Sequence, residues 1–269
     1  MKPENLIIYS DVDGTLSYGT ADTAVINEKN LASLQKFILD GGRFGIASGR
    51  NHQSVRNVLK DIDINMPVVE SNGAAVYDLK LNKNVVELYL DKEFKKFIYE
   101  FVRDRKNLGL SALNKSYSHQ MIMNDERDDN HLDYPRPLMN YEQFINEDIY
   151  KVAIVADKKS IDDALKTINH NTCFNYVAYA RSADIYIEFF NKSAGKWNGI
   201  KSALKYTDLK NRKLVCIGDH FNDIEMLKNA DIAICPDNAV QEVKECVHKT
   251  VCRCQEGAIW EAIEYLRRL

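Results

Sequence analysis

Residues 6–16 read LIIYSDVDGTL, and the strand and the acids within this stretch indicate the fold class of the chain. The apolar run from Leu6 to Tyr9 predicts a buried strand, and two acids, Asp11 and Asp13, follow it one residue apart. Two carboxylates this close repel each other, so an uncompensated pair is costly. One interpretation is a polar turn closed by Asp13-Gly14. The other is a metal-dependent site for phosphoryl transfer.

The composition is that of an ordinary globular protein. Of 269 residues, 45% are hydrophobic and 28% are charged, and the net charge is −3, which gives no basic field for holding nucleic acid. The N-terminal residues do not resemble a signal peptide, and no apolar stretch approaches the roughly 18 residues of a membrane span. The six cysteines lack the paired spacing of a zinc site, which favours free thiols. We therefore expect a cytoplasmic monomer or small homo-oligomer without nucleic-acid or membrane partners.

The order of predicted elements indicates a core with an insertion. Short β-rich runs alternate with amphipathic helices at both ends of the chain, with single strands expected at residues 43–48 and 66–77 and a helix at 55–64. Such alternation predicts a parallel sheet. The middle of the chain instead has hairpin-like strand pairs with helices between them. We predict a Rossmann-like α/β core from residues 1–78 and 191–269, interrupted by an α+β domain at 79–190.

A second group of acids follows another apolar strand. The sequence KLVCIGDHFNDIEML at 213–227 places Asp219, Asn222 and Asp223 after the run Leu214 to Ile217. Alone, this pattern is also typical of a helix N-cap. Together with Asp11 and Asp13, it brings up to four carboxylates to one edge of one sheet, which is untenable unless a cation lies among them. Magnesium suits such oxygen ligands and commonly bridges carboxylates to phosphate oxygens.

Groups that could bind an anion are expected at the same edge. Lys196, in NKSAGKWNG, begins a predicted helix, where free backbone amides and the helix dipole favour an anion. Ser48 and Arg50, in ASGR, follow the second strand. A surface lysine and a simple Ser-Gly turn are the alternatives. The order of these signals and their common position at strand ends favour the phosphoryl-transfer site.

The combination of DxDGTL, a strand-terminal serine, a lone lysine and GDxxND resembles the haloacid dehalogenase superfamily of phosphatases. The segment between Asp11 and Ser48 has room only for a helix and a strand, so the insertion falls between Ser48 and Lys196. This placement resembles members with a type II cap, in particular the Cof-like sugar-phosphate phosphatases. The likeness extends to SNGA at 71–74 and QEGAIW at 255–260.

The resemblance implies a magnesium-dependent phosphomonoester hydrolase that acts on sugar phosphates or similar small phosphorylated metabolites. Asp11 would be the nucleophile that forms an aspartyl-phosphate, and Asp13 the general acid and base. Ser48 and Lys196 would neutralise charge on the phosphoryl oxygens. A phosphohexomutase-type phosphotransferase with the same nucleophile, a non-catalytic binding protein on this fold and a nucleic-acid phosphatase are the alternatives.

The resemblance also implies the metal ligands and several candidates for substrate binding. Asp11, the backbone carbonyl of Asp13 and Asp219 would hold Mg²⁺, while Asn222 and Asp223 would support the site. The candidates for substrate binding are Gly49, Arg50, Asn72, Arg181, Glu188 and His220. The sequence departs from the family pattern at two places: the bulky His220 follows Asp219, and the stretch CPDNA, with Asn238, stands where many members have Gly-Asn-Ala. We expect these departures to affect the choice of substrate rather than the chemistry.

Overall fold

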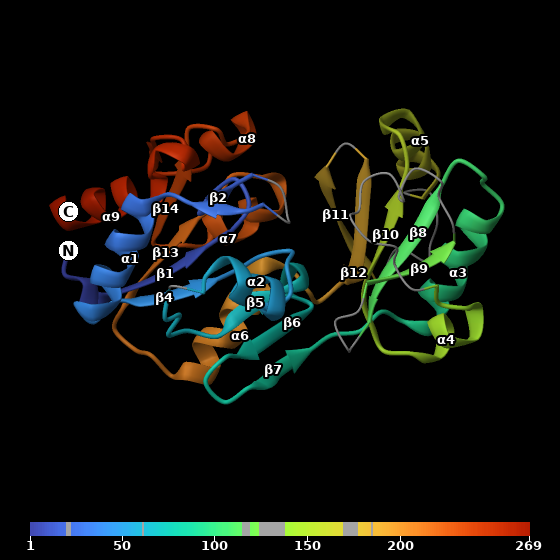
Figure 1. Ribbon diagram of the computed structural model, residues 1–269, viewed down its shortest axis with the longest axis horizontal. Coiled ribbons are helices and arrows are strands. Elements are labelled where there is room, and N and C mark those ends of the chain that lie inside the picture. Colours follow the sequence, from blue (N-terminus) through green and yellow to red (C-terminus); the bar gives the residue numbers. More distant parts are fainter. Residues whose placement is uncertain (20–22, 61, 115–118, 124–137, 169–176, 184) are drawn as a thin grey trace. The chain divides into compact units, whose positions relative to one another are not determined.

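The computed structural model describes residues 1–269 apart from 20–22, 61, 115–118, 124–137, 169–176 and 184 (Figure 1). It divides into two compact units, which we call the core unit, Met1–Val86 with Gly195–Leu269, and the inserted unit, Glu87–Ala194. The sequence-based boundaries lie at 78/79 and 190/191. The core unit extends to Val86 because Val85 and Val86 pack against its buried side chains.

The core unit is built on a five-stranded parallel sheet in the order β15-β14-β13-β1-β4. The apolar run Leu6–Ser10 forms a strand that is paired in parallel on both sides, which agrees with the predicted fold class. The strands are β1 (Leu6–Ser10), β4 (Arg43–Ile46), β13 (Lys213–Ile217), β14 (Ile232–Pro236) and β15 (Lys249–Val251).

Both faces of this sheet are covered, and β1 shows why. Leu6 and Ile8 pack into a cluster that contains residues of α1 (Glu28–Leu39) and α9 (Ala258–Arg268). Ile7 and Tyr9, which point the other way, pack into a cluster that contains residues of α6 (Lys196–Thr207) and α7 (Ile224–Lys228). Each buried Leu or Ile contributes roughly 1.5–3 kcal/mol. The result is a three-layer α/β/α core (Figure 1).

Two further short α-helices and two small sheets also belong to the core unit. The helices are α2 (His52–Val58) and α8 (Gln241–Lys244). One sheet pairs β2 (Ser17–Tyr18) with β3 (Val25–Ile26), and the other has the order β5-β6-β7, with β5 (Val68–Glu70), β6 (Ala75–Asp78) and β7 (Lys83–Glu87).

One sequence-based expectation in this region is wrong, and another has the wrong bounds. The single strand expected at 66–77 is the hairpin β5-β6, because Ser71, Asn72 and Gly73 adopt positive φ values of 52°, 56° and 88° and reverse the chain. The helix expected at 55–64 begins earlier, at His52, and ends at Val58. The side chain of Asn51 caps its first turn by accepting a hydrogen bond from the amide of Ser54 at 2.8 Å.

The inserted unit is a five-stranded antiparallel sheet with helices, the α+β class predicted for it. The strand order is β11-β12-β10-β8-β9, and aromatic and aliphatic side chains such as Phe94, Ile98, Val152 and Phe189 form its core. The strands are β8 (Gly109–Asn114), β9 (His119–Met123), β10 (Ile149–Val155), β11 (Val177–Ala183) and β12 (Tyr186–Asn191), and the helices are α3 (Lys92–Arg103), α4 (Tyr141–Asn146) and α5 (Lys158–Ile168).

The sequence predicts a solvated loop in the acidic stretch near 125–133 and a strand at 174–180. Residues 125–133 and 174–176 lie outside the described residues. In the described part of the chain, every helix is too short or too polar to cross a membrane.

Candidate active site

The pairing of β1 with β13 brings the first and second acid groups together. Ser10, the last residue of β1, lies opposite Ile217, the last residue of β13, in a parallel register. The next residue, Asp11, donates its amide hydrogen to the carbonyl of Ile217 at 2.9 Å. Asp219 follows β13 after one glycine. Both acids therefore lie at the carboxyl edge of the sheet, where parallel sheets place their ligands.

Lys196 links two of these acids. Its Nζ lies 2.8 Å from Asp11 Oδ1 and 2.6 Å from Asp223 Oδ1, and its side chain is 1% exposed. Burial by itself lowers the pKa of Lys196, but the charges and hydrogen bonds of Asp11 and Asp223 outweigh this effect and raise the pKa above its ordinary value. The predicted lysine is thus a buried, charged group in contact with the predicted nucleophile.

One lysine does not balance the acids around it. Asp11, Asp219 and Asp223 each offer a carboxylate oxygen, and these oxygens all lie within 4.8 Å of one another. Burial, with repulsion from Asp223 and Asp219, raises the pKa of Asp11 to about 8 against the attraction of Lys196. Burial, with repulsion from Asp223, also raises the pKa of Asp219 to about 6. Three carboxylates around one ammonium favour a further cation, and an all-oxygen ligand set suits Mg²⁺.

The loop after β1 holds the carboxylate of Asp219 in place. The hydroxyl of Thr15 donates a hydrogen bond to Asp219 Oδ1 at 2.6 Å. Gly14 has a φ of +80°, and a Cβ atom there would lie 2.4 Å from Asp219 Oδ2. The glycine of DxDGTL is therefore required both by its left-handed backbone and by the close approach of this carboxylate. Thr15 was not among the predicted site residues, although it stands in the motif.

Both carboxylate oxygens of Asp223 accept hydrogen bonds from other groups of the protein. Its Oδ2 accepts hydrogen bonds from the amides of Asp219 at 3.0 Å and His220 at 3.1 Å, while its Oδ1 contacts Lys196. It thereby fixes the turn after β13 and orients the lysine. The ring of His220 packs edge-on against Phe221, with 5.0 Å between centroids, and burial lowers the pKa of His220.

The loop after β4 places Ser48 and Arg50. Ser48 is buried, its amide donates to Val69 O at 2.9 Å, and its Oγ accepts a hydrogen bond from the amide of Arg50 at 3.2 Å. The guanidinium of Arg50 makes two hydrogen bonds to the carboxylate of Asp13. The structure thus joins a predicted substrate-binding residue to the predicted acid–base residue, a contact that the sequence does not indicate.

Asn72 and Asn222 connect two loops of the site. The amide of Asn72 donates to Ser48 O at 2.9 Å, and Asn72 Oδ1 accepts a hydrogen bond from Asn222 Nδ2 at 3.1 Å. A Cβ atom at Gly49 would lie 3.4 Å from Asn72 Oδ1, so Gly49 packs against this side chain. The left-handed turn 71–73 therefore brings Asn72 beside the loop that carries Ser48.

The two candidates of the inserted unit form ion pairs within that unit. Arg181 Nη1 donates to Asp162 Oδ1 at 2.7 Å. Glu188 accepts a hydrogen bond from Lys151 on the neighbouring strand β10, and both side chains are largely buried. The sequence predicted neither partner.

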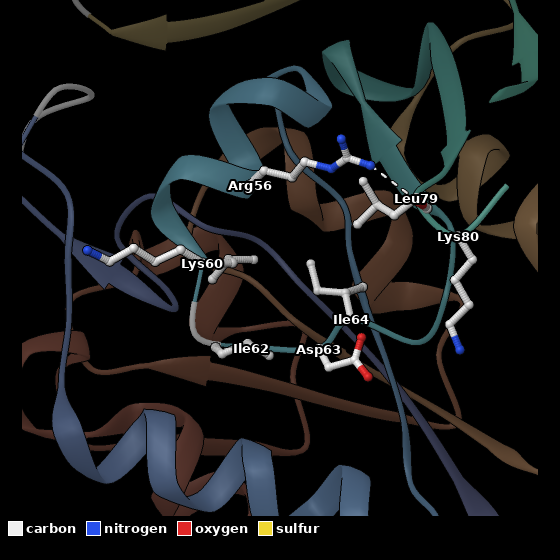
Figure 2. A pocket seen from close by; sticks show the side chains of 8 residues that line it. Arg56, Lys60, Ile62, Asp63, Ile64, Leu79 and Lys80 are labelled. Atoms are coloured by element: carbon white, nitrogen blue, oxygen red, sulfur yellow. Dashed lines mark hydrogen bonds between the residues drawn. The ribbon is translucent and has the colours of Figure 1, made fainter. Parts of the chain in front are cut away.

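A surface pocket of about 360 Å³ lies elsewhere in the core unit and contains none of the residues above. Figure 2 shows Arg56 extending toward Leu79, while Lys60 and Lys80 point away from each other. The amines do not converge on one point, so the pocket does not compete with the acidic cluster as the catalytic site. Its lining is Arg56, Leu59, Lys60, Ile62, Asp63, Ile64, Leu79 and Lys80.

Comparison with known proteins identifies the family. The sequence pattern of the haloacid dehalogenase-like hydrolases matches residues 8–263, nearly the whole chain. The chain belongs to this family. A Streptococcus pyogenes protein provisionally named a phosphatase is 25% identical over 249 residues, covering 89% of this chain and 90% of its own. The 5-amino-6-(5-phospho-D-ribitylamino)uracil phosphatase YitU of Bacillus subtilis is 21% identical, with 96% of each chain covered.

A solved structure shows the same fold. The subclass IIB sugar phosphatase BT4131 superposes with a TM-score of 0.81 at 19% identity, covering 98% of this chain and 100% of that one. The predicted resemblance and fold class are thereby confirmed. Family membership and the phosphatase names of these relatives make the chain a phosphatase of the haloacid dehalogenase-like class.

Proposed function

We propose that this phosphatase hydrolyses small phosphomonoesters in a magnesium-dependent reaction through an aspartyl-phosphate on Asp11. The observation that carries the proposal is the contact of Lys196 with both Asp11 and Asp223, with Asp219 close by at the same sheet edge. A buried carboxylate beside a buried ammonium is suited to attack phosphorus, because the lysine and a metal offset charge on the phosphoryl oxygens.

The residues of the site fit a divalent cation. Burial, together with repulsion among the neighbouring carboxylates, raises the pKa values of Asp11 and Asp219, and a divalent cation would offset both effects. Asp11, the backbone carbonyl of Asp13 and Asp219 would hold it, as in the family that the chain resembles. When bound, Mg²⁺ would neutralise negative charge on the phosphoryl group. Asp223 supports the site indirectly, because its oxygens are engaged by Lys196 and two backbone amides.

The protein's own groups account for the bonds made and broken. A carboxylate oxygen of Asp11 attacks phosphorus, the ester P–O bond breaks, and Asp13 donates a proton to the leaving alkoxide. Asp13 then takes a proton from a water molecule, which attacks the same phosphorus, and the bond between Asp11 and phosphorus breaks. In both steps Lys196 offsets the negative charge of the phosphoryl oxygens, and the Ser48 hydroxyl donates a hydrogen bond to them. The products are an alcohol and inorganic phosphate.

We propose sugar phosphates or similar phosphorylated metabolites as substrates, and the inserted unit as the cap that selects among them. In support, one relative is named for a phosphorylated ribityl compound and one structural neighbour for sugar phosphates. The type II cap resemblance supports the role of the insertion, with Arg181 and Glu188 as candidate contacts. The five described cysteines are free thiols, which supports the proposed cytoplasmic location.

The test measures phosphate release from a panel of sugar phosphates, nucleotides and phosphorylated cofactors. We expect activity with Mg²⁺, its loss on exhaustive chelation and its return when Mg²⁺ is restored. Asp11→Asn should be inactive while retaining the fold. Full activity after chelation would contradict the metal dependence, and an active Asp11→Asn would contradict the nucleophile. A requirement for a sugar bisphosphate activator would instead indicate a phosphohexomutase.

A further inference from the structure

The loop between β14 and α8 contacts three other segments that surround the acidic cluster. The amide of Val240 donates to the carbonyl of Asp219 at 3.0 Å. The side chain of Asn238 donates from Nδ2 to the carbonyl of Gly14 at 2.7 Å and accepts at Oδ1 from the amide of Cys254 at 2.9 Å. One loop therefore joins the segment after β13, the segment after β1 and the C-terminal segment before α9.

The peptide that Asn238 holds is also the one that defines the position of the Asp219 carboxylate. The Gly14 carbonyl belongs to the Gly14–Thr15 peptide group. On one side of this group, the Thr15 hydroxyl donates to Asp219 Oδ1 at 2.6 Å. On the other, Gly14 lies so close to Asp219 Oδ2 that no Cβ atom fits between them. A rotation of this peptide would therefore move the Thr15 hydroxyl and the surface against which Asp219 packs.

We propose that Asn238 is a positioning residue for the cation site, holding the Gly14–Thr15 peptide and, through it, the carboxylate of Asp219 in a metal-binding orientation. This inference rests on the proposed magnesium site. The position needs one hydrogen-bond donor for Gly14 and one acceptor for Cys254, and a side-chain amide supplies both. An aspartate in its place retains the acceptor but loses the donor, and an alanine loses both.

The chain contains a closely matched control. Asn65 is also half-buried, accepts a hydrogen bond at Oδ1 from the amide of Phe44 at 2.8 Å and donates from Nδ2 to the carbonyl of Gly42 at 2.9 Å. It bridges two backbone groups as Asn238 does, but at the start of β4, the end of that strand opposite Ser48. Substitution of Asn65 thus measures what the loss of a bridging amide costs the fold, without a change at the acids.

The experiment measures Mg²⁺ binding to the full-length protein by isothermal titration calorimetry, with no substrate present. We expect Asn238→Asp and Asn238→Ala to raise the Kd for Mg²⁺ by about 10- to 100-fold, the usual effect of losing a group that orients a metal ligand. Asn65→Asp and Asn65→Ala should leave the Kd for Mg²⁺ unchanged. They should lower the Tm by about as much as the corresponding Asn238 variants do. For Asn238→Asp, the two possible effects change the Kd in opposite directions. Loss of positioning would raise the Kd, whereas the added negative charge, acting through electrostatics alone, would lower it.

Each other outcome has a definite meaning. If the unsubstituted protein binds no Mg²⁺, the proposed function fails, whatever the variants do. If it binds Mg²⁺ and the Asn238 variants bind it equally well or more tightly, the positioning role is overturned. If both Asn238 variants fail to fold while the Asn65 variants fold, Asn238 serves the fold itself and the proposal is also overturned.

Discussion

The guanidinium of Arg50 holds both carboxylate oxygens of Asp13, with Nε 2.8 Å from Oδ2 and Nη2 2.7 Å from Oδ1. Arg50 is itself held by a hydrogen bond from Nη1 to Ser54 Oγ at 2.8 Å. Its side chain is 9% exposed, whereas that of Asp13 is 50% exposed. The proposed acid–base group therefore reaches solvent while a largely buried, forked cation sets its orientation, the geometry in which arginine binds carboxylates most strongly.

This pairing predicts that Arg50 contributes to the rate through the position of Asp13. Arg50→Gln should lower kcat by about 10- to 100-fold, because a misplaced catalytic group loses much of its advantage. Arg56→Gln is the control, since Arg56 lies on the helix that follows Arg50 and donates to the Leu79 carbonyl at 3.2 Å, away from the acids. Steady-state phosphate release from both variants checks the prediction. Equal rates for Arg50→Gln and Arg56→Gln would show that Asp13 needs no such support.

The contrast between Arg50 and Asp11 shows what the sequence can predict. The strand before Asp11 and the acids after it follow from an apolar run and a motif within sixteen residues, so both were predicted. The contact between Arg50 and Asp13 spans 37 residues and depends on how two loops meet. No local pattern encodes it. The same holds for Asn238: the stretch CPDNA differs from Gly-Asn-Ala at Asp237, and no local pattern indicates the contacts of the asparagine.

Local features of the chain explain where the predicted helices and strands differ from those of the structure. The hairpin at 68–78 differs from the predicted single strand because three residues with positive φ, Ser71 to Gly73, separate β5 from β6, and two of them are residues other than glycine, for which such values are uncommon. Helix α4 was missed although a signal exists. Asn140 and Gln143 form a reciprocal capping box, which marks a helix start in an otherwise polar stretch.

Gly14 provides a test of the close contact with Asp219. Gly14→Ala should cost about 1–2 kcal/mol for its left-handed backbone and also displace Asp219, abolishing activity. Gly41→Ala is the matched control: its φ is +90°, but the nearest atom to an added Cβ is Glu4 Cβ at 3.4 Å. Denaturant unfolding and phosphate release should show similar stability losses and an activity loss only for Gly14→Ala. Retained activity in Gly14→Ala would mean that Asp219 tolerates displacement.

The raised pKa of Asp219 predicts how the stability of the metal-free protein depends on pH. Because this pKa rises from an ordinary 3.8 to about 6 on folding, the folded state binds more protons between these values. The free energy of unfolding therefore falls as pH rises through this window. At pH values above this window, Asp219→Asn should have a higher Tm than the unsubstituted protein. Near pH 4, the difference in Tm between the two proteins should shrink.

A control variant and the addition of Mg²⁺ complete the test of the raised pKa of Asp219. Asp63→Asn removes the same charge at an exposed position and should not raise the Tm. Mg²⁺ should raise the Tm of the unsubstituted protein at pH 7.5 and have a much smaller effect on Asp219→Asn, because binding to the folded state alone stabilises it. A metal-free Asp219→Asn that is no more stable at pH 7.5 than the unsubstituted protein would contradict the charge deficit assigned to the acidic cluster.

Asp13 separates the proposed mechanism from direct attack by water. With p-nitrophenyl phosphate, the leaving group departs without a proton, so Asp13→Asn should still form the aspartyl-phosphate on Asp11. Hydrolysis of that intermediate would lack its base and should slow by about 10²- to 10⁴-fold. A burst of p-nitrophenolate stoichiometric with enzyme should precede a slow steady state, and rapid-quench mass spectrometry should detect the phosphorylated protein. Asp11→Asn is the control that cannot form it. Turnover of Asp13→Asn at the unsubstituted rate, with neither burst nor adduct, would assign the acid–base role to another group.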